Sequence, residues 1–148
     1  MKKKSTAVIG MVVCFMMMTS MAWSLDIPGV PNGTVTDGNL VWLKNANCFG
    51  KRNWNDAMSA AASLKSGMCG LTDGSKVGQW RLPTKDQLVR RSKNKQGFNN
   101  VQADYYWSSS TDAGYKASAW DVSMYSGYVN SNYKDDSYYY VWPVRGGQ

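Results

Sequence analysis

The sequence contains no histidine and no glutamate, and both absences narrow the chemistry open to it. Without histidine there is no Ser-His pair to activate a hydroxyl nucleophile, and the commonest metal ligand of proteins is missing. A serine would need lysine or aspartate as its base, and hydrolysis by two aspartates stays open, although the sequence does not say which two. The adjacent Asp135 and Asp136 could hold calcium, but two neighbouring carboxylates in a turn are more often solvated. We therefore predict that the protein is not an enzyme and uses no cofactor and no metal.

Long apolar runs are absent after the first two dozen residues. There, three lysines precede an apolar stretch over residues 7–18, and residues 22–24 (Ala-Trp-Ser) place small side chains where signal peptidase reads them. This pattern is typical of a secretory signal peptide. A membrane anchor is the alternative, but the run is shorter than the ~20 residues of a bilayer span. We predict a signal peptide at residues 1–24 and one ligand-binding domain at residues 25–148, exported to the periplasm or the cell surface.

Cysteine is scarce. Cys14 lies in the predicted signal peptide, so only Cys48 and Cys69 remain in the exported domain. In an oxidising compartment an isolated pair most simply forms a disulfide, and the spacing fits neither of the alternatives, a metal site or a redox pair. Closing this loop is worth about 3 kcal/mol on the chain-entropy model.

Three of the lysines that contribute to the net charge of +7 lie in the predicted signal peptide, so the exported domain is less basic than the full sequence. A second basic cluster follows residue 89 and consists of Arg90, Arg91, Lys93 and Lys95. Cations at a helix C-terminus favour the helix dipole, which is the structural interpretation. The functional interpretation is a binding site for a sulfated or phosphorylated polymer. We expect no nucleic-acid partner, because the chain is exported and only modestly basic.

The segment Trp80-Arg81-Leu82-Pro83-Thr84 is the pivot of the predicted fold. Pro83 disfavours helix before it, and Thr84 with Gln87 has the pattern of a capping box, so we predict a helix over residues 85–92. Trp80 and Leu82 are expected in the core, with Arg81 paired to a buried carboxylate or carbonyl. A first helix is predicted over residues 53–65, and residues 25–39 and 45–52 are expected to be loops, separated by a strand over 40–43.

The composition changes after residue 99. Most residues from 99 to 140 are Asn, Asp, Ser or Tyr, and all nine tyrosines lie there. We predict strands over residues 105–109, 119–125, 128–130 and 138–145, whose alternation leaves one polar face rich in tyrosine. Rigid aromatic area among adaptable polar groups is typical of antibody-like binding surfaces. The candidate ligand-binding residues are Tyr115, Asp121, Tyr125, Tyr128, Asn130, Asn132, Tyr133 and Tyr138.

Several short motifs, in order, resemble the Lcl C-terminal domain family, a bacterial exported module. They lie at residues 36–42, 54–57, 80–84, 106–110, 119–122 with Gly127, and 140–148. The resemblance implies an α+β, C-type-lectin-like fold with two helices packed on antiparallel strands and hairpins. It also implies ligand binding, with sulfated polysaccharide or host-surface glycans as the ligand class of one branch, and a homo-trimer as one oligomeric state. Trp142 departs from the family, in which most members carry arginine, and this puts an anion contact there in doubt.

Proteins of this fold include targets of diversity-generating retroelements, whose C-terminal stretch has a similar Asn, Tyr, Ser and Asp content. Three hypotheses follow. The first is an exported module that binds a glycan or protein ligand through its tyrosine-rich face, with or without such diversification. The second is an adhesin for sulfated polysaccharide acting through the basic cluster. The third is a structural envelope protein whose tyrosine face packs against another subunit.

Overall fold

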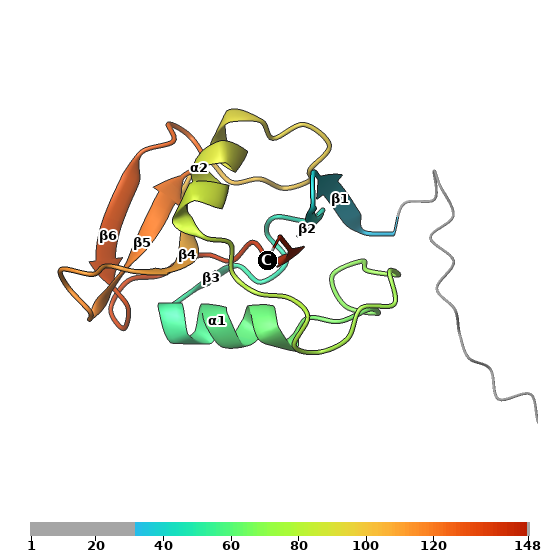
Figure 1. Cartoon of the computed structure of the whole chain (residues 1–148), viewed down its shortest axis with the longest axis horizontal. Helices are drawn as coiled ribbons and strands as arrows, with labels where there is room; N and C mark the ends of the chain where they lie inside the picture. The colour runs from blue at the N-terminus through green and yellow to red at the C-terminus, as the bar shows by residue number, and fades with distance from the viewer. Residues whose placement is uncertain (1–31, 148) are drawn as a thin grey trace, which may run out of the picture.

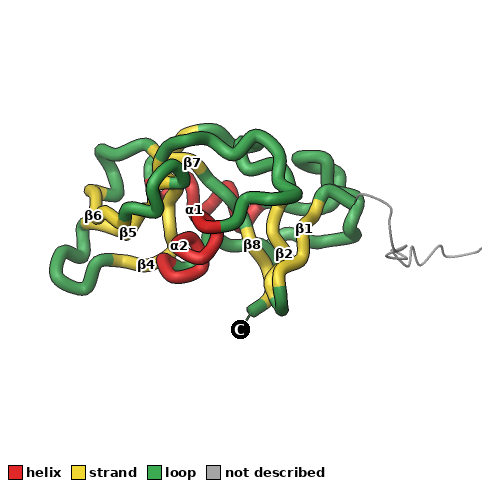
Figure 2. The backbone as a smooth tube through the Cα atoms, turned by 90° about the horizontal axis from the view of Figure 1, so that it is seen from above, coloured by secondary structure: helices red, strands yellow, loops and turns green. Residues whose placement is uncertain are grey.

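The computed structural model describes residues 32–147, and within them the chain forms two helices and eight strands in two sheets. The fold is therefore α+β, as predicted. The strands over residues 105–133 lie at one end of the molecule and the smaller sheet lies toward the other, with one helix above and one below the middle of the molecule in the view of Figure 1; Figure 2 shows the same arrangement from above. The predicted signal peptide lies outside the described residues. None of the helices over residues 32–147 is long and apolar enough to cross a membrane.

The smaller sheet has the order β1-β2-β8 and is antiparallel throughout. It consists of β1 (Thr34–Asp37), β2 (Leu40–Leu43) and β8 (Val144–Gly146). The prediction of a loop over residues 25–39 is thus wrong for its last part. Asp37 pairs with Leu40, so Gly38 and Asn39 form a two-residue hairpin turn, a signal that the sequence carries.

The larger sheet has the order β3-β7-β4-β5-β6, in which only β4 and β7 are parallel. Its strands are β3 (Lys51–Arg52), β7 (Tyr139–Tyr140), β4 (Tyr105–Thr111), β5 (Ser118–Ser123) and β6 (Val129–Tyr133). The predicted closing strand over 138–145 is divided into β7 and β8, which join different sheets, and Pro143 lies at the break. The two-residue strand β3 falls where a loop was predicted.

Both helices begin at the residues that the sequence indicates. Asn53 caps α1 (Trp54–Ser63) by accepting the N–H of Asp56, and Thr84 caps α2 (Lys85–Lys93) in a complete capping box with Gln87. Arg81 donates to the carbonyls of Leu82 and Gly146 and to the Gln87 side chain, so its predicted pairing is with carbonyl oxygens. The predicted pivot is confirmed.

The helices cover opposite faces of the larger sheet. Leu88 of α2 packs in the cluster that contains Tyr106, whereas Ala57 of α1 packs in the cluster that contains Trp107. Because successive residues of a strand point to opposite faces, β4 is buried on both sides. The same holds for β5, where Val122 and Asp121 are both fully buried. The polar face predicted for residues 119–125 is therefore not a solvent-facing surface along β5.

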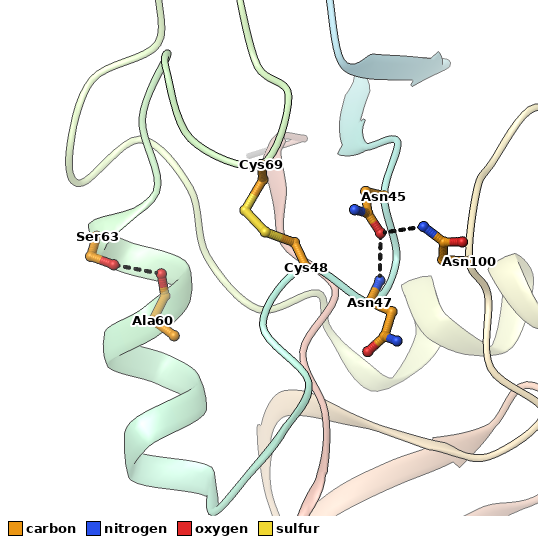
Figure 3. The surroundings of a disulfide bond; sticks show 7 residues. All are labelled: Asn45, Asn47, Cys48, Ala60, Ser63, Cys69 and Asn100. Atoms are coloured by element: carbon orange, nitrogen blue, oxygen red, sulfur yellow. Dashed lines mark hydrogen bonds between the residues drawn. A yellow bond between two sulfur atoms is a disulfide. The ribbon is translucent and has the colours of Figure 1, made fainter.

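The disulfide joins the segment before α1 to the segment after it, as predicted (Figure 3). Cys48 and Cys69 are 21 residues apart in sequence, and their Cα atoms are 5.7 Å apart. Trp142, the departure from the family pattern, is a core residue whose Nε1–H donates to the Leu43 carbonyl at 2.8 Å. Its ring makes edge contacts with Trp42 and Phe98, so it contributes no anion contact.

Candidate functional site

The five tyrosines predicted for ligand binding are the five that the structure exposes most, at 57–82% of their surface. The other four pack within the larger sheet, where Tyr105 contacts Tyr139 and Tyr106 contacts Tyr140. The exposed tyrosines form two groups at opposite ends of the β5–β6 hairpin. We call Tyr115, Tyr133 and Tyr138 the loop-side tyrosines, and Tyr125 and Tyr128 the turn-side tyrosines.

Hydrogen bonds fix the loop that carries Tyr115. Asp112 accepts the N–H of Gly114 at 2.9 Å and the hydroxyl of Ser131 at 2.6 Å, and these two donors hold the pKa of its carboxyl below the usual value. The Lys134 ammonium donates to the Lys116 carbonyl at 2.9 Å and lies 4.3 Å from the centre of the Trp54 ring. The loops before β5 and after β6 are therefore held together.

A tight turn carries the turn-side tyrosines. The Ser123 hydroxyl accepts the N–H groups of Tyr125 and Ser126, and the Ser123 N–H donates to the Tyr128 carbonyl. Gly127 has a φ of +76°, and a Cβ there would lie 3.0 Å from the Ser92 hydroxyl of α2. The turn therefore needs glycine both for its backbone conformation and for its close approach to α2.

The two tyrosine groups do not form one continuous aromatic surface. Tyr128 and Tyr133 are separated by the length of β6, about 17 Å at the usual rise of an antiparallel strand. Between them, Asn130 and Asn132 are half-buried. Asn130 accepts the N–H of Ser131, and Asn132 donates to Asp121 at 2.8 Å.

Asp121 does not present a hydrogen-bonding group to solvent, contrary to its predicted place among the ligand-binding residues. Its side chain is fully buried. Its Oδ2 accepts from Asn132, and its Oδ1 has no hydrogen-bond partner among the residues that the structure describes. Burial raises the pKa of this carboxyl to about 6. The prediction placed Asp121 on an outward face, but Trp107 is its neighbour on β4 and that face is covered.

The four residues of the predicted basic cluster also differ in how exposed they are. Arg91 is only 5% exposed, forms an ion pair with Asp37, and lies over the rings of Trp42 and Phe98 at 4.8 and 4.7 Å. It is therefore a core residue and not a surface anion contact, because α2 turns it toward the smaller sheet. Arg90 and Lys93 are exposed, and Lys95 is half-buried.

A surface depression of about 430 Å³ lies beside the turn-side tyrosines. Tyr125 and Lys95, which the sequence assigned to two different hypotheses, both line it, together with Phe98, Val101 and Met124. The apolar lining was missed, although two of these residues interrupt an otherwise polar stretch after α2. Among residues 32–147 no three His, Cys, Asp or Glu side chains gather as metal ligands would.

Comparison with known proteins gives one family. The family model of the Lcl C-terminal domain matches residues 33–145, which include both helices, the disulfide and every strand except the last residue of β8. A search of curated proteins finds no match.

Proposed function

The chain belongs to the Lcl C-terminal domain family, and from this we propose that it is an exported, non-catalytic module that binds its ligand through the loop-side and turn-side tyrosines. The ligand is a glycan or a protein outside the cell. The disulfide is compatible with export, because such bridges persist in oxidising compartments.

The observation that carries this proposal is the division of the nine tyrosines. Four stabilise the sheet, whereas five expose more than half of their surface on segments held by hydrogen bonds. An exposed tyrosine contributes little to folding, but it offers a large contact area at a low cost in conformational entropy. Because the turns are already ordered, less entropy is lost when a ligand binds.

The spacing of the two groups indicates the form of the ligand. A single sugar ring cannot contact tyrosines about 17 Å apart, whereas an extended glycan or a protein surface can. The half-buried Asn130 lies between the groups. Its side-chain oxygen accepts from Ser131, which leaves its amide N–H groups to donate to such a ligand.

The polyanion hypothesis has less support, because Arg91 is committed to the core and Lys95 uses two of its three N–H donors on carbonyl groups. The exposed cations of the cluster, Arg90 and Lys93, would make a small electrostatic site. If polyanion binding dominates, affinity falls steeply as salt increases, through counterion release. Binding through tyrosines depends far less on salt.

The proposal is tested with two double variants, Tyr125→Ala with Tyr128→Ala and Tyr115→Ala with Tyr133→Ala. A glycan array and pull-downs from envelope extracts identify the ligand, and its affinity is then compared at low and high salt. We expect each double variant to weaken binding by tenfold or more while the melting temperature stays within a few degrees, since these rings are exposed. Unchanged affinity in both variants, or binding lost only on removing Arg90 and Lys93, contradicts it.

A further inference from the structure

The depression beside the turn-side tyrosines has the composition of a small-molecule site. Phe98, Val101 and Met124 supply apolar lining, and the exposed ring of Tyr125 stands at its edge. A volume of about 430 Å³ lies in the range of ligand pockets. An apolar ring with a short chain matches this size.

Lys95 adds one charged group with an unused donor. Its ammonium donates to the Ser92 carbonyl at 2.5 Å and to the Met124 carbonyl at 2.9 Å, which leaves the third N–H for a ligand. These two bonds hold the ammonium at the pocket, so little side-chain entropy remains to be lost on binding.

No acidic side chain within residues 32–147 forms an ion pair with this ammonium. The three ion pairs formed within residues 32–147 join Lys51 to Asp104, Arg91 to Asp37 and Arg145 to Asp73, and none includes Lys95. Carbonyl dipoles are its only hydrogen-bond partners among these residues. A half-buried cation without a counter-ion favours an anionic ligand over a neutral one of the same shape.

We propose that this pocket binds a small carboxylic acid carried on an apolar ring, with the ring between Tyr125 and Phe98 and the carboxylate on Lys95. The pocket is separate from the loop-side tyrosines, and the inference does not depend on the macromolecular ligand proposed above. It assigns to Lys95 the recognition of one small carboxylate, whereas the polyanion hypothesis counted Lys95 among four cations that bind a polymer.

The test uses three probes: 3-phenylpropionate, 3-phenylpropanol of nearly the same shape without the charge, and propionate without the ring. Each is titrated into ¹⁵N-labelled protein with its disulfide formed, and amide shifts are followed at Gln102, Ala103 and Tyr125. We expect saturable binding of phenylpropionate, about tenfold weaker binding of the alcohol, and weaker binding of propionate, because each lacks one of the two contacts.

Lys95→Met is expected to abolish the preference for the acid over the alcohol. The matched control is Lys93→Met, which removes the same charge from an exposed neighbour outside the pocket and should keep the preference. Equal binding of acid and alcohol by the wild type, no saturable shift with the acid, or a preference that persists in Lys95→Met would overturn the proposal.

Lys95 also joins α2 to the turn after β5, and Lys95→Met removes both of these bonds, so a second variant that keeps them is included in the test. Tyr125→Ala leaves the Lys95 bonds intact and should weaken both ring-bearing probes several-fold, and unchanged affinities would overturn the proposal. Tyr128→Ala separates the two proposals, because Tyr128 does not line the pocket. This substitution should weaken binding of the macromolecular ligand and leave the affinity for phenylpropionate unchanged.

Discussion

Replacing Asp121 with asparagine should change how the stability of the protein depends on pH. The carboxyl is fully buried, and within the described part of the chain it has one hydrogen-bond donor at Oδ2 and none at Oδ1. Burial raises its pKa from 3.8 to about 6. Between these two values the folded protein binds a proton that the unfolded chain has released. The free energy of unfolding therefore falls as pH rises from about 4 to about 6 and is constant, for this group, above that range.

The magnitude follows from the size of the shift. A rise from 3.8 to about 6 corresponds to about 3 kcal/mol at 1.36 kcal/mol per pKa unit. Asparagine has nearly the same shape, keeps an oxygen for Asn132 and cannot ionise. At pH 4.0 more than half of the unfolded chains have already released this proton, so part of the effect is present there. Relative to wild type, the free energy of unfolding of Asp121→Asn should therefore be about 2.4 kcal/mol more favourable at pH 7.5 than at pH 4.0, whatever its cost at the lower pH.

Urea denaturation followed by tryptophan fluorescence at pH 4.0 and 7.5 measures this difference. Other carboxyls such as Asp112, whose pKa is lowered by its hydrogen-bond donors, act in the opposite sense but equally in both proteins. The exposed Asp136 gives the matched control, since Asp136→Asn should shift stability by the same amount at both pH values. A difference between wild type and Asp121→Asn that does not change with pH refutes the argument that Asp121 is buried without a compensating charge.

Two further predictions concern the frame that holds the hairpin. Cys48→Ser with Cys69→Ser should lower the free energy of unfolding by about 3 kcal/mol. Wild type treated with reductant should lose the same amount. A loss below about 1 kcal/mol in either experiment would contradict the assignment of a stabilising loop closure. Thr84→Ala should cost about 1 kcal/mol in urea denaturation, because the Gln87 N–H loses its acceptor at the start of α2, whereas Thr84→Ser should be close to neutral and thereby exclude a general effect of substitution.

Local signals in the sequence predicted local structure well. The capping box at Thr84 and the Asn53 cap involve residues three apart, so nothing distant is needed to recognise them. The bridge between Cys48 and Cys69 followed from having only two cysteines in the exported domain. Strands β1 and β3 were missed for different reasons. The turn at Gly38 and Asn39 indicated β1, but the prediction did not use it. Strand β3 has only two residues, so it has no periodicity to detect.

The errors at the candidate site have a long-range cause. Alternating residues predict which side chains of β5 share a face, but not that both faces are covered, and so Asp121 was expected at the surface. Arg91 was likewise placed among surface cations because its neighbours Arg90 and Lys93 are exposed. Its burial depends on Asp37, which is 54 residues away in the sequence. The exposed tyrosines were easier to predict, because turn residues flank them.

The arrangement of the smaller sheet determines where the protein can be immobilised on a surface or fused to another protein. Strands β1 and β8 both pair with β2, so the two ends of the described chain lie on either side of one strand, away from the β5–β6 hairpin (Figure 1). A sensor chip, a bead or a fused display protein can therefore be joined at either end without obstructing the tyrosines. Ligand capture measured in the two orientations should agree.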